Sequence, residues 1–145
     1  MATKIQIVFD CADPARVAGF WERALHYVSP PPPPPHTSWD EWARSEGIPE
    51  EQWNDARSVD DPGGDGPRLY FQKVPEPKIA KNRMHLDLNV GGGSSVPLTE
   101  RRRRIDTEVV RLKKLGATDE RGAMDRGDEY WVRMNDPEGN EFCIQ

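Results

Sequence analysis

Hydrophobic and polar residues alternate at the start of the chain. Residues 4–10 carry Ile or Phe at positions 5, 7 and 9, which is the period of a half-buried β-strand. Asp13 then supplies a helix N-cap and Pro14 a first helical residue. The apolar residues that follow recur at helical spacing and form one stripe: Val17, Phe20, Trp21, Ala24 and Leu25. The pattern predicts a strand followed by a helix over 13–25.

The second half of the chain repeats this order of patterns. Residues 84–90 alternate as a strand does, and a helix is predicted from Thr99, as its N-cap, to about Leu115. Its inward-facing residues are Ile105, Val109 and Leu112. Gly116 follows as a candidate C-cap. Further strands are predicted at 68–74, 129–134 and 141–145.

The periodicity is lost between the first helix and the strand at 68–74. Six consecutive prolines at 30–35 favour polyproline II, Ser38 can cap a short helix, and Pro49 can begin another. Three tryptophans lie in this polar stretch: Trp39, Trp42 and Trp53. We interpret residues 29–66 as an insertion. Its indoles either seal the edge of the core or form a lid over a pocket, and a protein-contact role is a third possibility.

An internal repeat organises the chain. An Asp-Pro-x-Gly turn at 61–64 precedes the strand at 69–72, and a second one at 136–139 precedes the strand at 142–145. Proline fixes φ for such a turn, and glycine supplies the positive φ that ends it. The repeat predicts an α+β fold of two tandem βαβββ modules. Their curved mixed sheets form a cleft, and the helices lie outside.

Three stretches are similar to the glyoxalase, bleomycin-resistance and extradiol-dioxygenase group, the vicinal oxygen chelate superfamily. They are FDCADPARVAGFW, FQKVPEPKIAKNRMHLDLNV and NDPEGNEFCIQ. The resemblance implies a single glyoxalase-like domain over 1–145. The first half-module covers about 1–76, with the insertion at 29–66, and the second covers about 82–145. It also implies a homodimer, because a partner subunit often completes such open sheets.

In enzymes of this superfamily the cleft holds one divalent metal, and its usual ligands are His or Gln, Glu, His and Glu. Strand phase maps these positions to Gln6, Tyr70, His85 and Cys143. Tyr70 and Cys143 replace both carboxylates, which removes the negative charge that balances a divalent cation. We therefore favour no metal. The alternative is one divalent ion held by Gln6 and His85, with Glu141 contributing only if the strand register shifts by one residue.

His85 and Asp87 are candidates for a catalytic acid–base pair, because they are two residues apart on one strand face. The other expectation for His85 is a structural bond to Asp87. Candidate ligand-binding residues are Gln6, Asp10, Tyr70, Gln72, Asn89, Cys143, Trp39 and Trp42. They suit a small polar molecule. We expect a small-molecule binding protein without the usual metal, and the alternative is a metal-dependent lyase, isomerase or dioxygenase.

Charge and composition exclude several other classes. The net charge is −5 and the pI about 5.2, which argues against a nucleic-acid partner. No apolar run approaches a membrane span, and no signal-peptide core is visible. Two cysteines are too few for a disulfide framework, so we expect a reduced, cytoplasmic protein.

Four consecutive arginines at 101–104 stand in the first turns of the second helix, where they oppose the helix dipole. They indicate either a solvated face or a site for an anion or a partner. In a solvated face their counter-charges are Glu100, Asp106 and Glu108.

Overall fold

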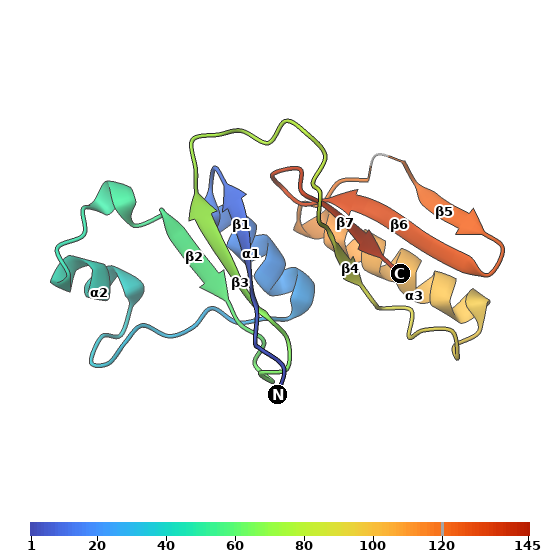
Figure 1. Ribbon diagram of the computed structural model, residues 1–145, viewed down its shortest axis with the longest axis horizontal. Coiled ribbons are helices and arrows are strands. Elements are labelled where there is room, and N and C mark those ends of the chain that lie inside the picture. Colours follow the sequence, from blue (N-terminus) through green and yellow to red (C-terminus); the bar gives the residue numbers. More distant parts are fainter. Residues whose placement is uncertain (120) are drawn as a thin grey trace. The chain divides into compact units, whose positions relative to one another are not determined.

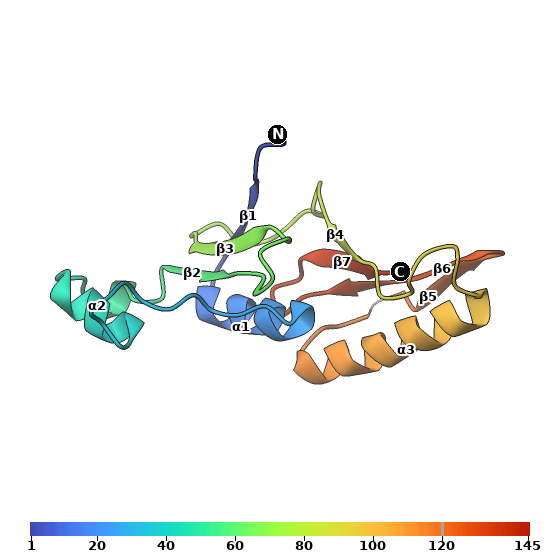
Figure 2. The ribbon, with the colours of Figure 1, turned by 90° about the horizontal axis from the view of Figure 1, so that it is seen from below.

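Each half of the chain forms its own mixed β-sheet, with a helix against one face (Figure 1; Figure 2). The computed structural model describes residues 1–119 and 121–145, and it divides into unit 1 (Met1–Pro77) and unit 2 (Lys78–Gln145). The predicted α+β class with two βαβββ-like modules is confirmed.

Unit 1 contains the first sheet. Its elements are β1 (Gln6–Cys11), α1 (Pro14–Leu25), α2 (Trp39–Ser45), the 3-10 helix η1 (Glu50–Gln52), β2 (Ala56–Val59) and β3 (Arg68–Lys73). β3 lies in the centre of the sheet, parallel to β1 and antiparallel to β2. Helix α1 buries Phe20 and Trp21, and Phe9 of β1 lies 5.7 Å from the Trp21 ring and 5.4 Å from that of Phe71. These aromatic contacts form the core of unit 1.

Unit 2 contains the second sheet, in the order β4-β7-β6-β5. Its elements are β4 (Leu86–Leu88), α3 (Leu98–Leu115), β5 (Ala123–Arg126), β6 (Glu129–Asn135) and β7 (Glu141–Ile144). Helix α3 buries Ile105 and Leu112 on the side of β6 and β7, where Met134, Phe142 and Ile144 are buried too. Among the described residues, no helix has both the length and the apolarity that a membrane span requires.

The two units correspond strand for strand except at one place. β1, β2 and β3 of unit 1 match β4, β6 and β7 of unit 2 in order and direction. Isolated bridges mark equivalent points, Val28 with Asp60 and Thr118 with Asn135. After the bridge residue, unit 2 continues into β5, whereas unit 1 continues into α2 and η1. The tryptophan-bearing segment therefore takes the place of an edge strand in the chain order.

Most of the elements predicted from the sequence are present, and four details differ. Helix α3 begins at Leu98 with Pro97 as N-cap, so Thr99 lies inside the helix and the prediction of a Thr99 cap is wrong. The strand at 84–90 is shorter, and Ile5 precedes β1 and is 68% exposed. The strands β2 and β5 were not predicted. β2 lies within the segment interpreted as an insertion, although it pairs with β3.

Two local signals in the tryptophan-bearing segment, Ser38 and Pro49, were interpreted correctly, whereas residues 33–35 lie in a bend and a turn rather than in a continuous polyproline II stretch. The Ser38 hydroxyl accepts a hydrogen bond from the Glu41 amide at 3.1 Å and caps α2. Pro49 precedes η1 as its N-cap residue. The predicted C-cap Gly116 has φ 111° and ends α3. A capping hydroxyl, a proline before the first turn and a glycine with positive φ thus identify helix ends even where the apolar pattern is weak.

The arginines at 101–104 have partners close by, as expected of a solvated face. Glu100 accepts hydrogen bonds from Arg103 and Arg104, which together lower its pKa to about 2. Arg102 pairs with Asp125 at 2.7 Å. The other two acidic residues expected as partners bond elsewhere, Asp106 to the Tyr130 hydroxyl and Glu108 to Arg111.

The two Asp-Pro-x-Gly turns share one hydrogen-bond pattern. Asp136 is only 2% exposed, and its carboxylate accepts from the amides of Glu138 and Asn140 and from the Asn140 side chain, each at 2.9 Å. In unit 1, Asp61 accepts from the Gly63 amide at 2.9 Å. A carboxylate that satisfies several amides fixes the turn, and with it the register of the strand that follows.

Replacing Asp136 with Ala should lower the free energy of unfolding by about 1–3 kcal/mol, because the substitution leaves buried amide donors without an acceptor. Urea unfolding followed by circular dichroism would measure this loss. Asp128→Ala, at an exposed position of another turn, is the matched control and should change stability by about 0.5 kcal/mol or less. Equal stability of the two variants would contradict the role assigned to Asp136.

Candidate functional site

The strand register of unit 2 gathers polar side chains on the sheet face opposite α3. Cys143 of β7 lies between Asp87 of β4 and Arg133 of β6, since it is the register partner of both. Neighbours two positions away on a strand share a face, so His85 lies on the same face as Asp87. The buried residues that alternate with them, such as Phe142, face the core below α3.

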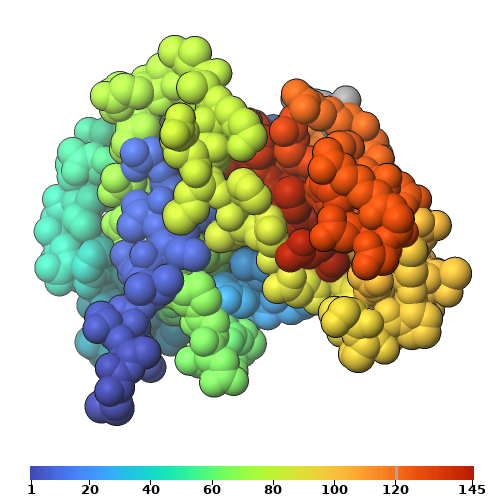
Figure 3. All heavy atoms as spheres, turned by 45° about the vertical axis from the view of Figure 1, so that its right-hand side comes forward, coloured from blue at the N-terminus to red at the C-terminus, as the bar shows by residue number. Residues whose placement is uncertain are grey.

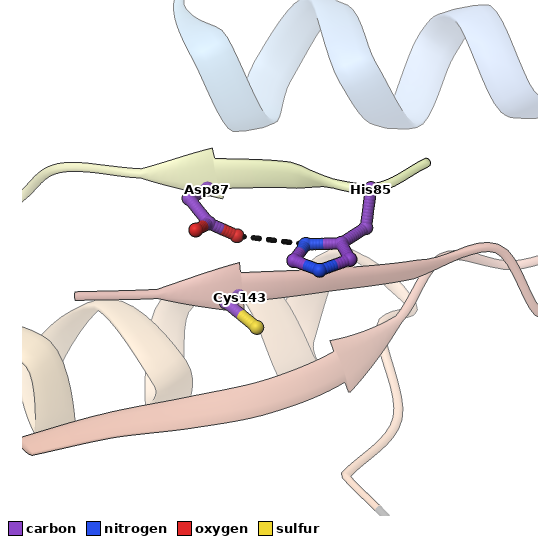
Figure 4. Close-up of side chains that lie close together, drawn as sticks. All are labelled: His85, Asp87 and Cys143. Atoms are coloured by element: carbon purple, nitrogen blue, oxygen red, sulfur yellow. Dashed lines mark hydrogen bonds and ion pairs between the residues drawn. The ribbon is translucent and has the colours of Figure 1, made fainter. Parts of the chain in front are cut away.

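Three of these side chains form a close group, which we call the His85–Asp87–Cys143 cluster (Figure 4). Nδ1 of His85 lies 2.9 Å from Oδ1 of Asp87, so the predicted bond between these two residues is confirmed. One ligand atom from each member lies within 4.8 Å of the others. Figure 4 shows the thiol of Cys143 below the same carboxylate. Asp87 is therefore the common acceptor of the cluster.

Burial and Asp87 keep the thiol of Cys143 protonated at neutral pH. Burial raises the pKa of Cys143 most, and the negative charge of Asp87 and its hydrogen bond to the thiol raise the pKa further. Arg133 and Lys81 act in the opposite direction but do not outweigh these effects. A neutral thiol is a weak nucleophile and a weak metal ligand. Cys143 thus serves as a hydrogen-bond donor in this state.

The cluster lies in the wall of a pocket of about 660 Å³, a volume suited to a small molecule. All of its lining residues belong to unit 2. The polar ones include Lys81, Asn89, Arg133, Glu141 and Gln145. Arg133 is half-buried, and within the part of the chain that the structure describes its guanidinium forms no hydrogen bond or ion pair. A half-buried cation without a counter-charge favours an anionic ligand.

Glu141 lies on the same sheet face as Cys143, two residues away on β7. The expectation that Glu141 faces the site only after a one-residue shift of register is therefore wrong. Its carboxylate accepts a hydrogen bond from the Asn82 amide at 3.0 Å and pairs with Lys78 at 3.2 Å. Burial alone would raise the pKa of Glu141, but these donors outweigh it and lower the pKa. Glu141 is thus a carboxylate already engaged with the segment before β4.

Asp10, Gln72 and Asn89 were also predicted to bind a ligand, and they belong to equivalent cross-strand pairs of the two units. Gln72 donates to Asp10 at 2.7 Å in unit 1, and Gln145 donates to Asn89 at 2.8 Å in unit 2. The internal repeat therefore preserves a cross-strand hydrogen bond as well as the backbone. Gln6 lies on the same face of β1 as Asp10. The spheres of this N-terminal strand, in blue, lie at the surface in Figure 3.

The structure brings together two of the four predicted ligand positions, His85 and Cys143. Gln6 and Tyr70 lie on the corresponding sheet face of unit 1. That all four residues form one ligand set stays a prediction. Asp87 was not predicted as a metal ligand, and Arg133 was not predicted as a site residue. The alternation within 129–134 contains the signal for Arg133, because it places every second residue on the face of Cys143.

The donors of the cluster fit a borderline cation. An imidazole nitrogen, a carboxylate and a thiol are ligands that Zn²⁺ takes, and three protein ligands leave a position for substrate. With Asp87 and Cys143 ionised, their two negative charges would balance a divalent ion. Hard cations that prefer oxygen ligands suit the thiol less well.

A family model described as glyoxalase-like domain matches residues 6–145. A fosfomycin resistance protein FosX mutant from Listeria monocytogenes, complexed with Mn(II) and 1S,2S-dihydroxypropylphosphonic acid, has a TM-score of 0.60 and 11% identity, over 100% of this chain and 90% of that one. A possible glyoxalase from Bacillus cereus has a TM-score of 0.60 and 15% identity, over 100% and 99%. At such identities the likeness is one of fold. No curated protein sequence matches the chain.

We expect the rate of Cys143 alkylation by iodoacetamide to rise with pH with a midpoint above 9.0, the ordinary pKa of a cysteine thiol. Asp87→Asn should lower the midpoint, because it removes the negative charge and keeps the side-chain size, while burial persists. Peptide-resolved mass spectrometry separates Cys143 from the buried Cys11. Asp128→Asn, an exposed substitution in the same unit, is the control and should leave the midpoint unchanged. A wild-type midpoint below 9.0 would refute the assigned environment.

Proposed function

We propose that this chain, which belongs to the family of glyoxalase-like domain proteins, binds a small polar molecule with an anionic group in the unit 2 pocket. His85, oriented by Asp87, is the group that exchanges a proton or a hydrogen bond with the ligand. The observation that carries the proposal is the His85–Asp87 pair in the wall of that pocket. The protein performs this role without the metal that is usual in the superfamily.

The bond to Asp87 gives His85 a defined orientation. An ionised carboxylate next to Nδ1 favours the proton on that nitrogen, so Nε2 keeps its lone pair. Within the described residues, Nε2 of His85 has no hydrogen-bond partner, and the side chain is 41% exposed. A ligand hydroxyl or acidic C–H group placed next to Nε2 meets a base whose ring is held in position.

The polar lining of the pocket supports an anionic ligand. Arg133 is half-buried and lacks a carboxylate partner, while Glu141 is already bound by Lys78. The guanidinium can hold a carboxylate or phosphonate through two parallel hydrogen bonds. The neutral thiol of Cys143, which donates to Asp87, adds no negative charge beside it. These groups favour acids over amines of the same size.

A homodimer and a cytoplasmic location stay predictions.

A metal-dependent enzyme of the glyoxalase type is the second candidate. The observation that favours it is the spacing of the His85–Asp87–Cys143 cluster, whose ligand atoms lie within 4.8 Å of one another. A bound ion would polarise a ligand oxygen as a Lewis acid. His85 and Asp87 would then act as ligands rather than as an acid–base pair, so the two candidates assign different roles to the same residues.

Screening with a panel of small carboxylates and phosphonates should identify compounds that raise the unfolding temperature in differential scanning fluorimetry. At a concentration of about 100 Kd, such a compound stabilises the fold by about 2.7 kcal/mol. Arg133→Met should abolish the shift, because it removes the guanidinium and keeps the side-chain bulk. Arg83→Met, at an exposed position outside the pocket lining, should preserve it. If no compound in the panel shifts the transition, or if both variants respond as the wild type does, the proposal fails.

Elemental analysis of protein purified without chelator or affinity tag separates the two candidates. The proposed function predicts less than about 0.2 equivalents of any transition metal, unchanged after incubation with Zn²⁺ at pH 8 and desalting. The metal-dependent alternative predicts close to one equivalent. It also predicts that Cys143→Ala lowers this content, because the cluster then loses a ligand. Cys11→Ala, a variant of the thiol in the core of unit 1, is the control.

A further inference from the structure

A second pocket belongs entirely to unit 1. It has a volume of about 430 Å³ and shares no lining residue with the unit 2 pocket. The tryptophans of the segment between α1 and β2 form one part of its wall: Trp39, Trp42 and Trp53. Ser58, Arg68 and Tyr70 of the sheet face opposite α1 form another part. The described residues of unit 2 form no counterpart of this wall, because β5 stands in the chain where unit 1 has α2 and η1.

The indoles are held by their own hydrogen bonds. Nε1 of Trp39 donates to the Pro30 carbonyl at 2.8 Å, and Nε1 of Trp53 donates to the Ile48 carbonyl at 2.9 Å. The rings of Trp39 and Trp42 meet edge to face, with centroids 5.3 Å apart and planes at 84°. Trp39 nevertheless remains 42% exposed. Oriented aromatic faces that are open to solvent are suited to stacking against a flat ring.

The pocket also offers donors that the protein itself does not use. Among the described residues, neither Nε1 of Trp42 nor the hydroxyl of Tyr70 has a hydrogen-bond acceptor. Arg57 is half-buried and donates only to the backbone carbonyls of Trp53 and Ala56, and no carboxylate pairs with it in the described part of the chain. Two unused donors and a cation without a carboxylate partner in one pocket favour a ligand with acceptor oxygens.

Two carboxylates also line this pocket and oppose the binding of an anion. Asp40 and Asp55 are exposed, whereas Arg57 is half-buried. Water and salt screen the exposed charges more than the half-buried one. Arg68 lines the pocket too, but it already bonds to Ser58 at 2.6 Å and lies 3.7 Å from Asp60. Arg57 is therefore the half-buried charge without a carboxylate partner that a ligand meets.

We propose that the unit 1 pocket is a second ligand site, which binds a planar aromatic carboxylate. The ring stacks against the exposed indole of Trp39, next to the half-buried indole of Trp42. The carboxylate accepts hydrogen bonds from Arg57 and from the unused donors of Trp42 and Tyr70. This site does not depend on the function proposed for unit 2, since no residue is common to both pockets.

A calorimetric titration with three probes tests the two halves of this recognition. 2-Naphthoate has the ring and the charge, 2-naphthalenemethanol has only the ring, and decahydro-2-naphthoate has the charge without the flat ring. We expect 2-naphthoate to bind about ten-fold more tightly than either of the others, because a charge-assisted pair or a stacked ring contributes on the order of that factor. Equal affinities for the three probes, or no binding of 2-naphthoate below about 1 mM, would overturn the proposal.

Variants locate the site. Arg57→Met should weaken 2-naphthoate about ten-fold and leave 2-naphthalenemethanol unchanged, whereas Arg16→Met, at an exposed position of unit 1 outside the pocket, should affect neither. Trp131→Leu removes an indole from the unit 2 pocket and should have no effect on 2-naphthoate. Loss of binding in Trp131→Leu with retention in Arg57→Met would assign the ligand to unit 2 and refute the unit 1 site.

The wild-type protein provides a readout that does not require a variant to fold. The five tryptophans give separate indole N–H signals in a ¹H–¹⁵N spectrum. 2-Naphthoate should move the Trp42 signal most, since this donor is unused in the free protein, and should leave those of Trp21 and Trp131 in place. Movement of the Trp131 signal alone would contradict the proposal.

Discussion

The buried carboxylate of Asp136 constrains the register of β7, and the geometry of the unit 2 site depends on that register. Its bonds to the amides of Glu138 and Asn140 shape the turn from which β7 begins. A strand that started one residue later would place Phe142 on the open face and Cys143 in the core. The contacts of Cys143 with its neighbours Asp87 and Arg133 would then be lost, whereas the bond between His85 and Asp87 lies outside β7 and would remain. A turn of polar side chains thus positions a chemical group several residues away.

The alternation of residue types and the repeated turns were enough to predict the sheet faces, because phase and register follow from local sequence. His85, Asp87 and Cys143 share a face for this reason. The strand β2 was missed because its sequence, Ala-Arg-Ser-Val, has too few apolar residues to give a period. β2 forms because it pairs with β3, a strand that lies further along the chain. Arg133 was missed for a related reason, since its importance depends on the lack of a partner, which no sequence pattern reveals.

The two units share one module but present different surfaces to a ligand. Unit 2 completes its sheet with β5, whereas unit 1 uses the same stretch of chain for α2 and η1. An edge strand satisfies its neighbour by backbone hydrogen bonds, but a tryptophan-bearing segment offers side-chain faces instead. The hydrogen bonds of Trp39 and Trp53 to carbonyls of the same segment hold these faces in place. The expectation that the indoles only seal the core does not explain why Trp39 remains 42% exposed.

The His85–Asp87–Cys143 cluster can hold either protons or a metal ion, and the two states compete for the same lone pairs. The proton on the Cys143 thiol is stabilised by burial first and by Asp87 second, as the raised pKa of this thiol shows. A metal ion must displace that proton, so its apparent affinity falls as the thiol pKa rises and increases with pH. The position of Asp87 therefore has opposite effects on the two functions. It orients His85 as a base, and it raises the pKa of the thiol that a metal ion would have to deprotonate.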